Sequence, residues 1–560
     1  MRNRESVDGL TVGAVAGTNV VLLAWTMPKA ACKGLRGFAV HRTDHLGEEA
    51  SWLQGQKTFK ETDPGMPAGS KHSTREQPIQ DFTWSDYTAK PGYDYTYRVL
   101  ALKGPVTKLQ PTREVSIRIQ TESPEGGDHD VYFNRGAAAS QEFARRFGDR
   151  APGTVNGDAD PAWAWLSRGN HEAILGFIER AKGAGWGIRV CAYEFRLPSV
   201  IDALRAARDR GADVKILYDA GKAFPRDDNR SAVAAGHIGD LIKERLPTPL
   251  ALSHNKFIVL LRNGKAKAVL TGSTNFSTGG VFGQSNVVHI VDDAKVAATY
   301  LVTWDALLAN PQRKPLAASF TSGRLIDAAY PPVGTTSVFS PRSTLDALEF
   351  YANQARAAQD ALFMTFAFGI GTIFKKVYRE AATPLRYALL EKLLGPGIKK
   401  AKIPAAIEEM KQLRFLPENR FAVGSHIELN TFDHWLGERL TGLNTHVKYI
   451  HTKYMLTDPL GPNPVVITGS ANFSEASSDE NDENMLVIRG NARVADIYLG
   501  EFMRLWSHNA FREWAAARAA AGVTAHAALQ EPWHLDTTDA WWQRRFKDRA
   551  LTAYREYFTR

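Results

Sequence analysis

Two short stretches of the sequence, HNKFIVLL from His254 and HTKYMLTD from His451, each place a lysine two residues after a histidine. A GS-x-NFS segment follows in each copy, with its serine nineteen residues after the histidine. Histidine can attack or transfer protons near neutral pH, and lysine supplies a fixed positive charge. Serine and asparagine add hydrogen-bond donors. The combination is typical of a site that holds an anion and moves protons beside it.

These stretches belong to an internal duplication. At an offset of 197 residues no gap is needed from histidine to GS-x-NFS, and ten of the 24 positions from His254 to Ser277 are identical. Unrelated stretches of ordinary composition should share roughly one or two. One inserted residue later, DDAKVAATYL (292–301) still matches GNARVADIYL (490–499). Two copies of one unit predict a single site shared between two halves.

H-x-K followed by GS-x-N, twice in one chain, resembles the phospholipase D superfamily over roughly residues 130–520. That superfamily includes phospholipases, phospholipid synthases, nucleases and tyrosyl-DNA phosphodiesterases. The resemblance implies a phosphodiesterase that works through a phosphohistidine intermediate, with no cofactor and no metal. A single H-x-K would be uninformative, whereas two copies with matched GS-x-N segments are highly specific.

Phosphodiester chemistry gives a task to each residue type that the two motifs share. The lysines place positive charge on the phosphoryl oxygens, and the amides and hydroxyls donate hydrogen bonds. One neutral histidine attacks phosphorus, the other protonates the leaving oxygen, and water then attacks the phosphohistidine. The predicted catalytic residues are His254, His451, Lys256, Lys453, Asn275, Asn472 and Glu483, and the predicted substrate-binding residues are Ser273, Ser470 and Asn286.

The two halves differ at an acidic residue. Glu483 stands eleven residues after the asparagine of its motif, where the family carries a carboxylate that steadies an active-site histidine, and we align it with Ser285 in the first copy. A carboxylate favours the cation that forms as a histidine attacks. In the family this contact tends to cross between halves, which would make His254 the nucleophile and His451 the general acid. Pairing within one half would reverse these roles, and both arrangements stay open at this point.

Only the second copy keeps the aspartate that ends the family motif. Asp458 is present, whereas Leu261 occupies the matching place in the first copy. Because the histidine and lysine contact the phosphate in this family, we interpret the aspartate as mainly supporting structure and its loss as tolerable. The departure still leaves room for a weak or altered first site.

The first 120 residues have the character of a β-sandwich. Short β-prone runs are separated by turn residues: VVLLAW (20–25), GFAVHR (37–42), YTYRVLAL (95–102) and VSIRIQT (115–121). The side chains expected in its core are Trp25, Tyr95, Tyr97 and Val99. The stretch resembles a fibronectin type III module and is followed by the linker SPEGGDHD (123–130).

Beyond the linker, strands alternate with amphipathic helices, which predicts a mostly parallel sheet covered on both faces. In the second half a longer helical insertion is expected from about 371 to 414. The fold class is therefore a pseudo-twofold pair of phospholipase D-like α/β domains preceded by a small all-β sandwich. The predicted boundaries are a sandwich at 1–122, the first half at 123–320, the second half at 321–535 and a basic aromatic C-terminal helix at 536–560.

Three segments bear on the substrate. We interpret SSDENDEN (477–484) as a solvated acidic loop that would repel a long polyanion near the mouth. The segment 387–410 is an amphipathic, basic lid candidate, equally compatible with plain packing and with contact to lipid. The segment 541–560 is expected to pack on the body, with a membrane or nucleic-acid contact as the alternative. The lid candidate and the acidic loop, together with the unequal halves and the family resemblance, favour a phospholipid, by hydrolysis or headgroup exchange. The basic C-terminal segment would serve the alternative of a nuclease, and a non-catalytic scaffold is a further alternative.

Composition adds broad limits. The 560 residues carry a formal net charge of +9, which favours anionic partners only mildly. Cys32 and Cys191 are too few for a disulfide framework or a structural zinc site. We find neither a clear signal peptide nor an apolar run long enough for a bilayer, so a cytoplasmic, monomeric protein is the default expectation. Its expected partner is a phospholipid or membrane surface, alternatively nucleic acid, and the sandwich is free to bind a protein or a glycan. Four other histidines, His171, His289, His434 and His446, are expected to be structural.

Overall fold

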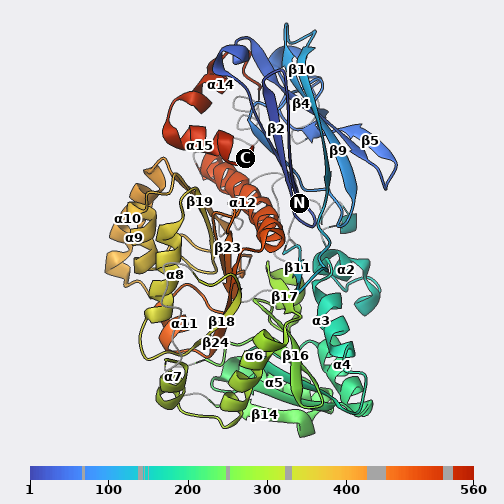
Figure 1. Ribbon diagram of the computed structural model, residues 1–560, viewed down its shortest axis with the longest axis vertical. Helices are drawn as coiled ribbons and strands as arrows, with labels where there is room; N and C mark the ends of the chain where they lie inside the picture. Colours follow the sequence, from blue (N-terminus) through green and yellow to red (C-terminus); the bar gives the residue numbers. More distant parts are fainter. Residues whose placement is uncertain are drawn as a thin grey trace.

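The computed structural model describes residues 1–65, 70–136, 143, 146–148, 150–246, 252–321, 331–395, 397–424, 449–520 and 534–560. Figure 1 shows an all-β module at one end and two α/β halves at the other. The long helix α12 (Ala492–Ala520) runs between them. This arrangement confirms the predicted fold class.

The N-terminal module consists of two four-stranded antiparallel sheets and a small two-stranded one. The first sheet is ordered β1 (Arg2–Val7), β2 (Leu10–Ala16), β3 (Val21–Thr26) and β8 (Thr83–Asp86). The second is ordered β10 (Gln110–Gln120), β9 (Asp94–Lys103), β4 (Leu35–Asp44) and β5 (Glu49–Trp52), and the small sheet pairs β6 (Gln54–Gly55) with β7 (His72–Ser73). All four aromatic and aliphatic side chains predicted for the core are buried there. The narrower likeness to a fibronectin type III module stays a prediction.

Each α/β half contains one seven-stranded sheet, and the two sheets have corresponding strand orders. The first is ordered β11 (His129–Phe133), β17 (Val287–Val291), β16 (Lys265–Gly272), β15 (Phe257–Arg262), β12 (Trp186–Ala192), β13 (Asp213–Asp219) and β14 (Ile242–Arg245). The second is ordered β18 (Gly334–Ser340), β24 (Glu483–Arg489), β23 (Val465–Gly469), β22 (Tyr454–Thr457), β19 (Ala361–Phe366), β20 (Leu385–Leu390) and β21 (Asn419–Val423). This correspondence is the structural form of the sequence duplication.

The expectation of a mostly parallel sheet is wrong. Only β12, β13 and β14 pair in parallel in the first half, and the other neighbours are antiparallel. The sequence holds the reason at Asn263 and Gly264, which join β15 to β16 with φ values of 49° and 74°. Asn-Gly in this left-handed conformation forms a two-residue hairpin turn, and such a turn can only join antiparallel strands.

Helices cover the two sheets. Those of the first half are α2 (Pro161–Ser167), α3 (Asn170–Glu179), α4 (Pro198–Asp209), α5 (Ala223–Ala235), α6 (Ala294–Leu308) and α7 (Arg313–Thr321). Those of the second half, besides α12, are α8 (Asp346–Ala357), α9 (Thr372–Glu380), α10 (Ile403–Phe415) and the short α11 (Glu475–Asp479). Amphipathic periodicity anticipated α3, α4 and α8 closely.

The predicted helical insertion at 371–414 needs correction, and so does the lid at 387–410. Residues 385–390 form β20, a fully buried strand between β19 and β21. The run LRYALL was interpreted as helical because a short apolar run has no period that separates a buried strand from a helix. The helical parts of the range are α9, the 3-10 turn η6 (Lys400–Lys402) and α10. Between β20 and η6, Gly395 and Ile398 line the cleft described below.

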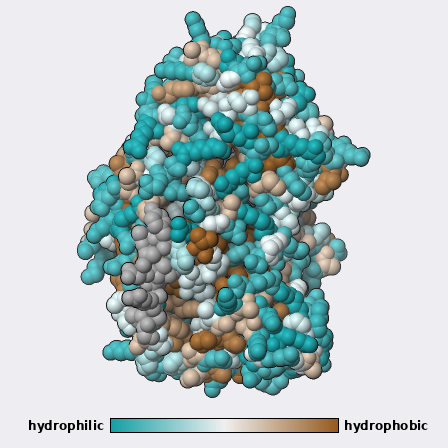
Figure 2. Space-filling view, in the orientation of Figure 1, coloured by the Kyte–Doolittle hydropathy of each residue, from teal (hydrophilic) through white to brown (hydrophobic). Residues whose placement is uncertain are grey.

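The C-terminal segment packs on the body as expected. Helices α14 (Ala540–Gln543) and α15 (Arg549–Tyr557) lie against the sandwich (Figure 1). The Trp541 indole donates to the Leu35 carbonyl at 3.0 Å, and Trp541 and Trp542 belong to the sandwich core. The face of the molecule in Figure 2 is mainly hydrophilic with small scattered apolar patches. Among the described helices, none has the length and apolar character needed to cross a bilayer.

Candidate active site

The two motif segments meet across the interface between the halves. His254 N donates to the carbonyl of Asp482 in the other half at 2.9 Å. In the mirrored contact, His451 N donates to the carbonyl of Ser285 in the first half at 3.3 Å. Each histidine is therefore held in place by backbone of the opposite half, which brings the two copies into one site.

His254 and Glu483 form the predicted contact across the halves. The His254 Nδ1 lies 2.9 Å from Glu483 Oε2, and Ser470 Oγ donates to the same oxygen at 2.7 Å. Glu483 is 1% exposed. A carboxylate on Nδ1 orients the ring and leaves its Nε2 to react. The alternative of pairing within one half is not what the structure contains.

His451 has an equivalent but uncharged partner. Its Nδ1 lies 2.9 Å from Asn286 Oδ1, and Ser273 Oγ donates to that oxygen at 2.8 Å. This geometry corrects the alignment of Glu483 with Ser285, because Asn286 stands at the same 197-residue offset and makes the matching contacts. Asn286 therefore orients a histidine, which is not the substrate contact predicted for it, and the two histidines differ by one charge in their surroundings.

Both motif lysines are buried beside their histidines. Lys256 Nζ donates to the carbonyl of His254 at 2.6 Å, and Lys453 Nζ to that of His451 at 2.5 Å. Each lysine is 1% exposed. The two motif asparagines complete the set, because the amide oxygens with no hydrogen-bond partner in the described structure include those of Asn275 and Asn472. Two cations and two amides thus converge on one place.

Two carboxylates missed in the sequence fix the motif backbones. Asp219 Oδ2, at the end of β13, accepts from Ser253 N at 2.6 Å. Glu391 Oε2, just after β20, accepts from Ile450 N at 2.8 Å. Each acid thus holds the residue before a motif histidine. The residues that flank Asp219 and Glu391 differ in the two copies. The two acids are related by their equivalent positions, each at the end of the middle one of three parallel strands.

The acidic loop at 477–484 is not solvated, contrary to expectation. Residues 481–484 are buried, and Asp482 accepts from Arg245 Nε at 2.9 Å with both side chains at most 2% exposed. Arg245 belongs to the first half. Loss of one partner of such a buried ion pair strongly destabilises the fold, because the other charge is left buried and unpaired. The loop therefore joins the halves, and only its beginning faces the cleft.

Burial and mutual repulsion set the charges of the site. The pKa of His254 is lowered well below its usual value by burial first and then by the Lys256 and Lys453 cations. Burial likewise lowers the pKa of His451 and of Lys453, and brings that of Lys256 to about 8. The same burial raises the pKa of Glu483 to about 7. A neutral His254 is the form that can attack an electrophile.

Asp458 has a structural task. Its carboxylate accepts from the backbone N–H groups of Gln359, Asp360 and Ala361 at 2.8, 2.7 and 3.0 Å, at the start of β19. Leu261 in the first half is instead buried in the apolar core. The interpretation of the aspartate as supporting structure is thereby confirmed.

We expect Asp458→Ala to lower stability without altering the site. Leaving three backbone donors without their acceptor should cost about 2 kcal/mol, and Asp458 also has φ of 46°, which alanine adopts less readily. Thermal unfolding should show a lower midpoint, while activity per folded molecule stays within about twofold. Asp458→Asn, which keeps an acceptor oxygen, is the matched control. Loss of activity at an unchanged midpoint would contradict this reading.

A cleft of about 770 Å³ opens above the two histidines. Its walls include apolar side chains from both halves, namely Phe224, Leu252, Phe366, Phe368, Ile370, Ile398 and Phe473. Acidic side chains also line it, namely Glu194, Glu475, Asp479 and Glu480. Among the described lining residues the one lysine or arginine is Lys375, which is half-buried and paired with Glu409 at 2.6 Å. Away from the buried lysines, the cleft is apolar and acidic.

Two of the four histidines predicted to be structural lie in the described part of the chain, and both make structural contacts. His171 pairs with Ser199 at 2.7 Å, and His289 bonds both His129 and Tyr498 inside the core. His434 and His446 lie outside the described residues. No group of three or more metal-ligating side chains is present in the described part of the chain.

A site that takes one histidine and one lysine from each of two similar α/β halves is suited to phosphoryl chemistry. A family model described as "Cardiolipin synthase, PLD-like domain" matches residues 176–307 and 423–506, the segments that carry the two motifs. The chain belongs to the phospholipase D superfamily, whose members are phosphodiesterases and transferases. No curated protein sequence matches the chain.

Three solved structures show a limited likeness to the chain. A phosphatidylserine synthase from Haemophilus influenzae Rd KW20 shares 12% identity, with 61% of this chain and 85% of that one covered and a TM-score of 0.43. Nuc from Salmonella typhimurium shares 29% identity over 25% of this chain and 87% of its own, at a TM-score of 0.21. A polyphosphate kinase from Porphyromonas gingivalis shares 12% identity at a TM-score of 0.37, and the match covers 57% of this chain and 43% of that one. At these TM-scores the likenesses assign no activity.

Proposed function

We propose that this protein is a phospholipase D-type enzyme that removes or exchanges the headgroup of a phospholipid. The observation that carries the proposal is the composition of the cleft, in which two buried lysines and two histidines lie beneath apolar walls. The lysines would hold the phosphate, and Phe366, Phe368 and Ile398 would contact acyl chains. The acidic side chains around the mouth would repel the neighbouring phosphates of a nucleic acid.

The reaction follows from the unequal partners of the histidines. Nε2 of His254 attacks phosphorus, the bond from phosphorus to the headgroup oxygen breaks, and His451 gives its proton to that oxygen. Glu483 stabilises the cation formed on His254. Water then attacks phosphorus, the P–N bond breaks, and His451 takes the proton from the water. An alcohol in place of water gives headgroup exchange.

The neutral partner of His451 suits the acid role. Asn286 does not hold a proton on the ring as strongly as a carboxylate would, so the imidazolium gives it up more readily. In the empty site burial keeps the pKa of His451 low, and the negative charge of a bound phosphodiester would raise it again. The substrate itself thereby helps to charge its general acid. Lys256 and Lys453 would balance the charge on the phosphoryl oxygens, assisted by the amides of Asn275 and Asn472.

The pH profile of kcat/KM should be bell-shaped with its maximum between about 7 and 8. Glu483 has a pKa of about 7, so below that pH it binds a proton and the carboxylate is lost. Lys256 has a pKa of about 8, so above that pH its cation is lost. In Glu483→Gln the acidic limb should disappear and kcat/KM should fall about 100-fold. Asn481→Ala removes a 3.3 Å contact to Glu483 and a 3.2 Å contact to Leu252 N but leaves the carboxylate in place, so it should keep both limbs. An unchanged acidic limb in Glu483→Gln would exclude this carboxylate as its source.

Mixed phospholipid vesicles incubated with the protein, EDTA and ethanol test the substrate by mass spectrometry of the lipids. Phosphatidic acid and phosphatidylethanol should form, and neither should form with His254→Ala. Their formation in EDTA would also support the expected independence from metal. No lipid product would overturn the substrate proposal. Cleavage of DNA by the same protein, falling steeply with salt, would then favour a nuclease. Binding without any turnover would favour a scaffold.

A further inference from the structure

A second cavity of about 690 Å³ lies far from the histidines in the fold, where the sandwich meets α12 and the C-terminal segment. It is lined by strand β8 and the loops around β6 and β7 on one side, and by α12, η8 (Arg544–Phe546) and α15 on the other. None of the residues that line the two-histidine cleft lines this cavity. Its volume is within the range of small-molecule sites. The cavity exists only because the sandwich packs against the second half.

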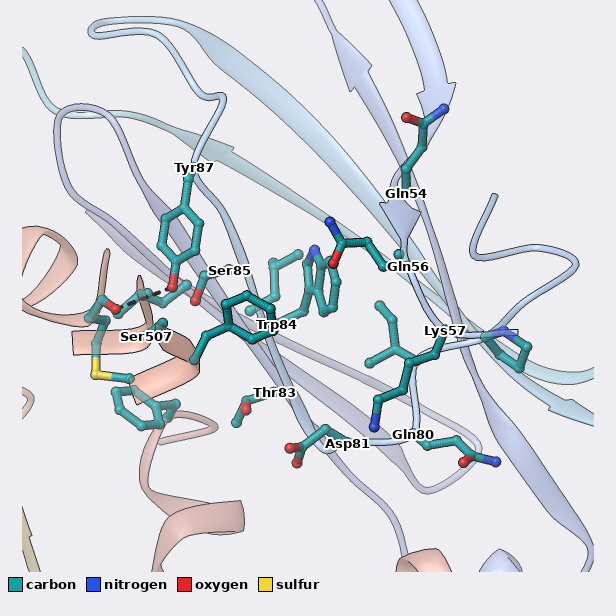
Figure 3. Close-up of a pocket in the computed structure, with 18 of the residues that line it drawn as sticks. Gln54, Gln56, Lys57, Gln80, Asp81, Thr83, Trp84, Ser85, Tyr87 and Ser507 are labelled. Atoms are coloured by element: carbon teal, nitrogen blue, oxygen red, sulfur yellow. Dashed lines mark hydrogen bonds between the residues drawn. The ribbon is translucent and has the colours of Figure 1, made fainter. Parts of the chain in front are cut away.

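Part of the cavity wall is apolar. Leu23 of the sandwich and Met503, Trp506 and Phe511 of α12 contribute to it. Trp84, on β8, lies between Tyr87 and Ser85 on one side and Gln56 and Lys57 on the other (Figure 3). The indole is only partly buried, so an apolar ligand could still cover it and remove that surface from water.

The other part of the wall is cationic. The charged side chains that line the cavity are Lys57, Lys71, Arg544, Arg545 and one carboxylate, Asp81. That carboxylate is already paired with Arg545 at 2.5 Å. Figure 3 shows the Lys57 side chain extending toward Asp81 and Gln80 at the edge of the cavity. The Lys57 side chain is exposed, but desolvation of its ammonium at the edge of the cavity, and then the Arg544 cation, lower its pKa. The positive charges here exceed the negative ones, so an anion would be attracted.

Several polar groups at this edge are available to a ligand. Within the part of the chain that the structure describes, no hydrogen bond or ion pair engages the side chains of Gln54, Gln56, Lys57 or Arg544. Gln80, by contrast, is occupied on both sides, since it donates to and accepts from the backbone of Asp536. The available groups are thus two amides and two cations next to an exposed indole face.

We propose that this junction cavity binds an anionic amphiphile, with its apolar chain along Trp84 and the α12 wall and its anionic group between Lys57 and Arg544. The amides of Gln54 and Gln56 would donate to the remaining oxygens of that group. A neutral glycan could use the same indole and amides, but it would leave the excess positive charge unmatched. Because the cavity is built from both sides, the ligand would bridge the sandwich and the second half. The proposal does not depend on the reaction at the histidines.

Isothermal titration with monomeric dodecyl phosphate tests this site on the full chain. The wild type should bind it, and Lys57→Gln/Arg544→Gln should weaken binding at least tenfold. Both side chains are exposed, so the double variant should fold. Lys265→Gln/Lys267→Gln, two exposed lysines on β16, is the matched control and should bind like the wild type. Trp84→Ala should also weaken binding, by loss of the apolar contact.

Three further binding measurements distinguish this proposal from other ligand classes and from binding in the catalytic cleft. Dodecyl maltoside, with the same chain and a neutral sugar, should bind at least tenfold more weakly, and equal binding would overturn the anionic class. Inorganic phosphate alone should bind far more weakly, and equal binding would remove the apolar part of the proposal. Lys453→Gln should leave the affinity unchanged. Loss of binding in Lys453→Gln, together with no effect of Lys57→Gln/Arg544→Gln, would place the ligand in the catalytic cleft and overturn the junction site.

Discussion

His254→Ala is expected to lower turnover of the phospholipid by at least about 10⁴-fold, because it removes the atom that forms the covalent bond to phosphorus. Half of the site would remain, but neither lysine can replace the nucleophile. Turnover is measured from headgroup release with the fold checked by thermal unfolding. Although His254 is only 8% exposed, its backbone contact to Asp482 does not depend on the imidazole, so the variant should stay folded.

His45→Ala in the sandwich is the control for the loss of an imidazole, because its ring lies at an exposed position, in contact with Thr96. It should keep full activity. His451→Ala should also be nearly inactive on the phospholipid. On substrates with an acidic leaving alcohol, such as p-nitrophenol, the rate of its first step should be largely restored, because such an alcohol needs no proton to leave. The opposite pattern, recovery in His254→Ala and none in His451→Ala, would exchange the two roles.

Lys453→Met is expected to lower kcat/KM by about 10³-fold. It removes a buried charge that would lie against the phosphoryl oxygens, where a fixed cation is worth far more than in water. Methionine has a similar length and no charge. Since burial already lowers the pKa of Lys453 far below its usual value, the fold should tolerate the change well.

The matched control is Lys265→Met, an exposed lysine at the start of β16. It should change kcat/KM by less than twofold. If Lys453→Met kept full activity while unfolding at a lower temperature, the lysine would be a structural residue, and the account of phosphate binding would have to rest on Lys256 alone.

The motif residues could be predicted because the duplication fixed their register. Two histidines at a constant offset, each with the same lysine, serine and asparagine spacing, define two similar units whose site must be shared. The contact of Glu483 with His254 followed from the family pattern, and the structure places it there. The 197-residue offset of the motifs also matches Asn286 to Glu483, whereas the alignment with Ser285 is wrong by one position.

Other features depend on contacts between segments that the sequence does not relate. Asp219 and Glu391 hold the two motif backbones, yet their flanking residues differ, and only the strand order puts them in equivalent places. The buried pair of Arg245 and Asp482 joins residues 237 positions apart, so the acidic run around Asp482 looked solvated. A local sequence pattern reports composition, but it does not reveal which distant side chain neutralises a charge.

Strand direction was the larger error in the fold. The alternation of strands with helices suits β12, β13 and β14, which are parallel, but it was extended to the strands that carry the motifs. The Asn263-Gly264 turn was the available signal for an antiparallel pair. The apolar run of β20 was interpreted as helical for a different reason, since full burial removes the alternation that marks a strand.

The central claim, that His254 becomes phosphorylated while His451 handles protons, is tested most directly by locating the covalent intermediate. His451→Ala is mixed with a p-nitrophenyl phosphodiester, quenched in base to preserve phosphohistidine, digested and analysed by peptide mass spectrometry. If His254 is the nucleophile, the adduct should appear on the peptide that contains His254, more slowly when Lys453→Met is combined with His451→Ala, and not at all when His254→Ala is combined with it. An adduct on the His451 peptide of the His254→Ala protein, with none on His254 in any variant, would contradict it.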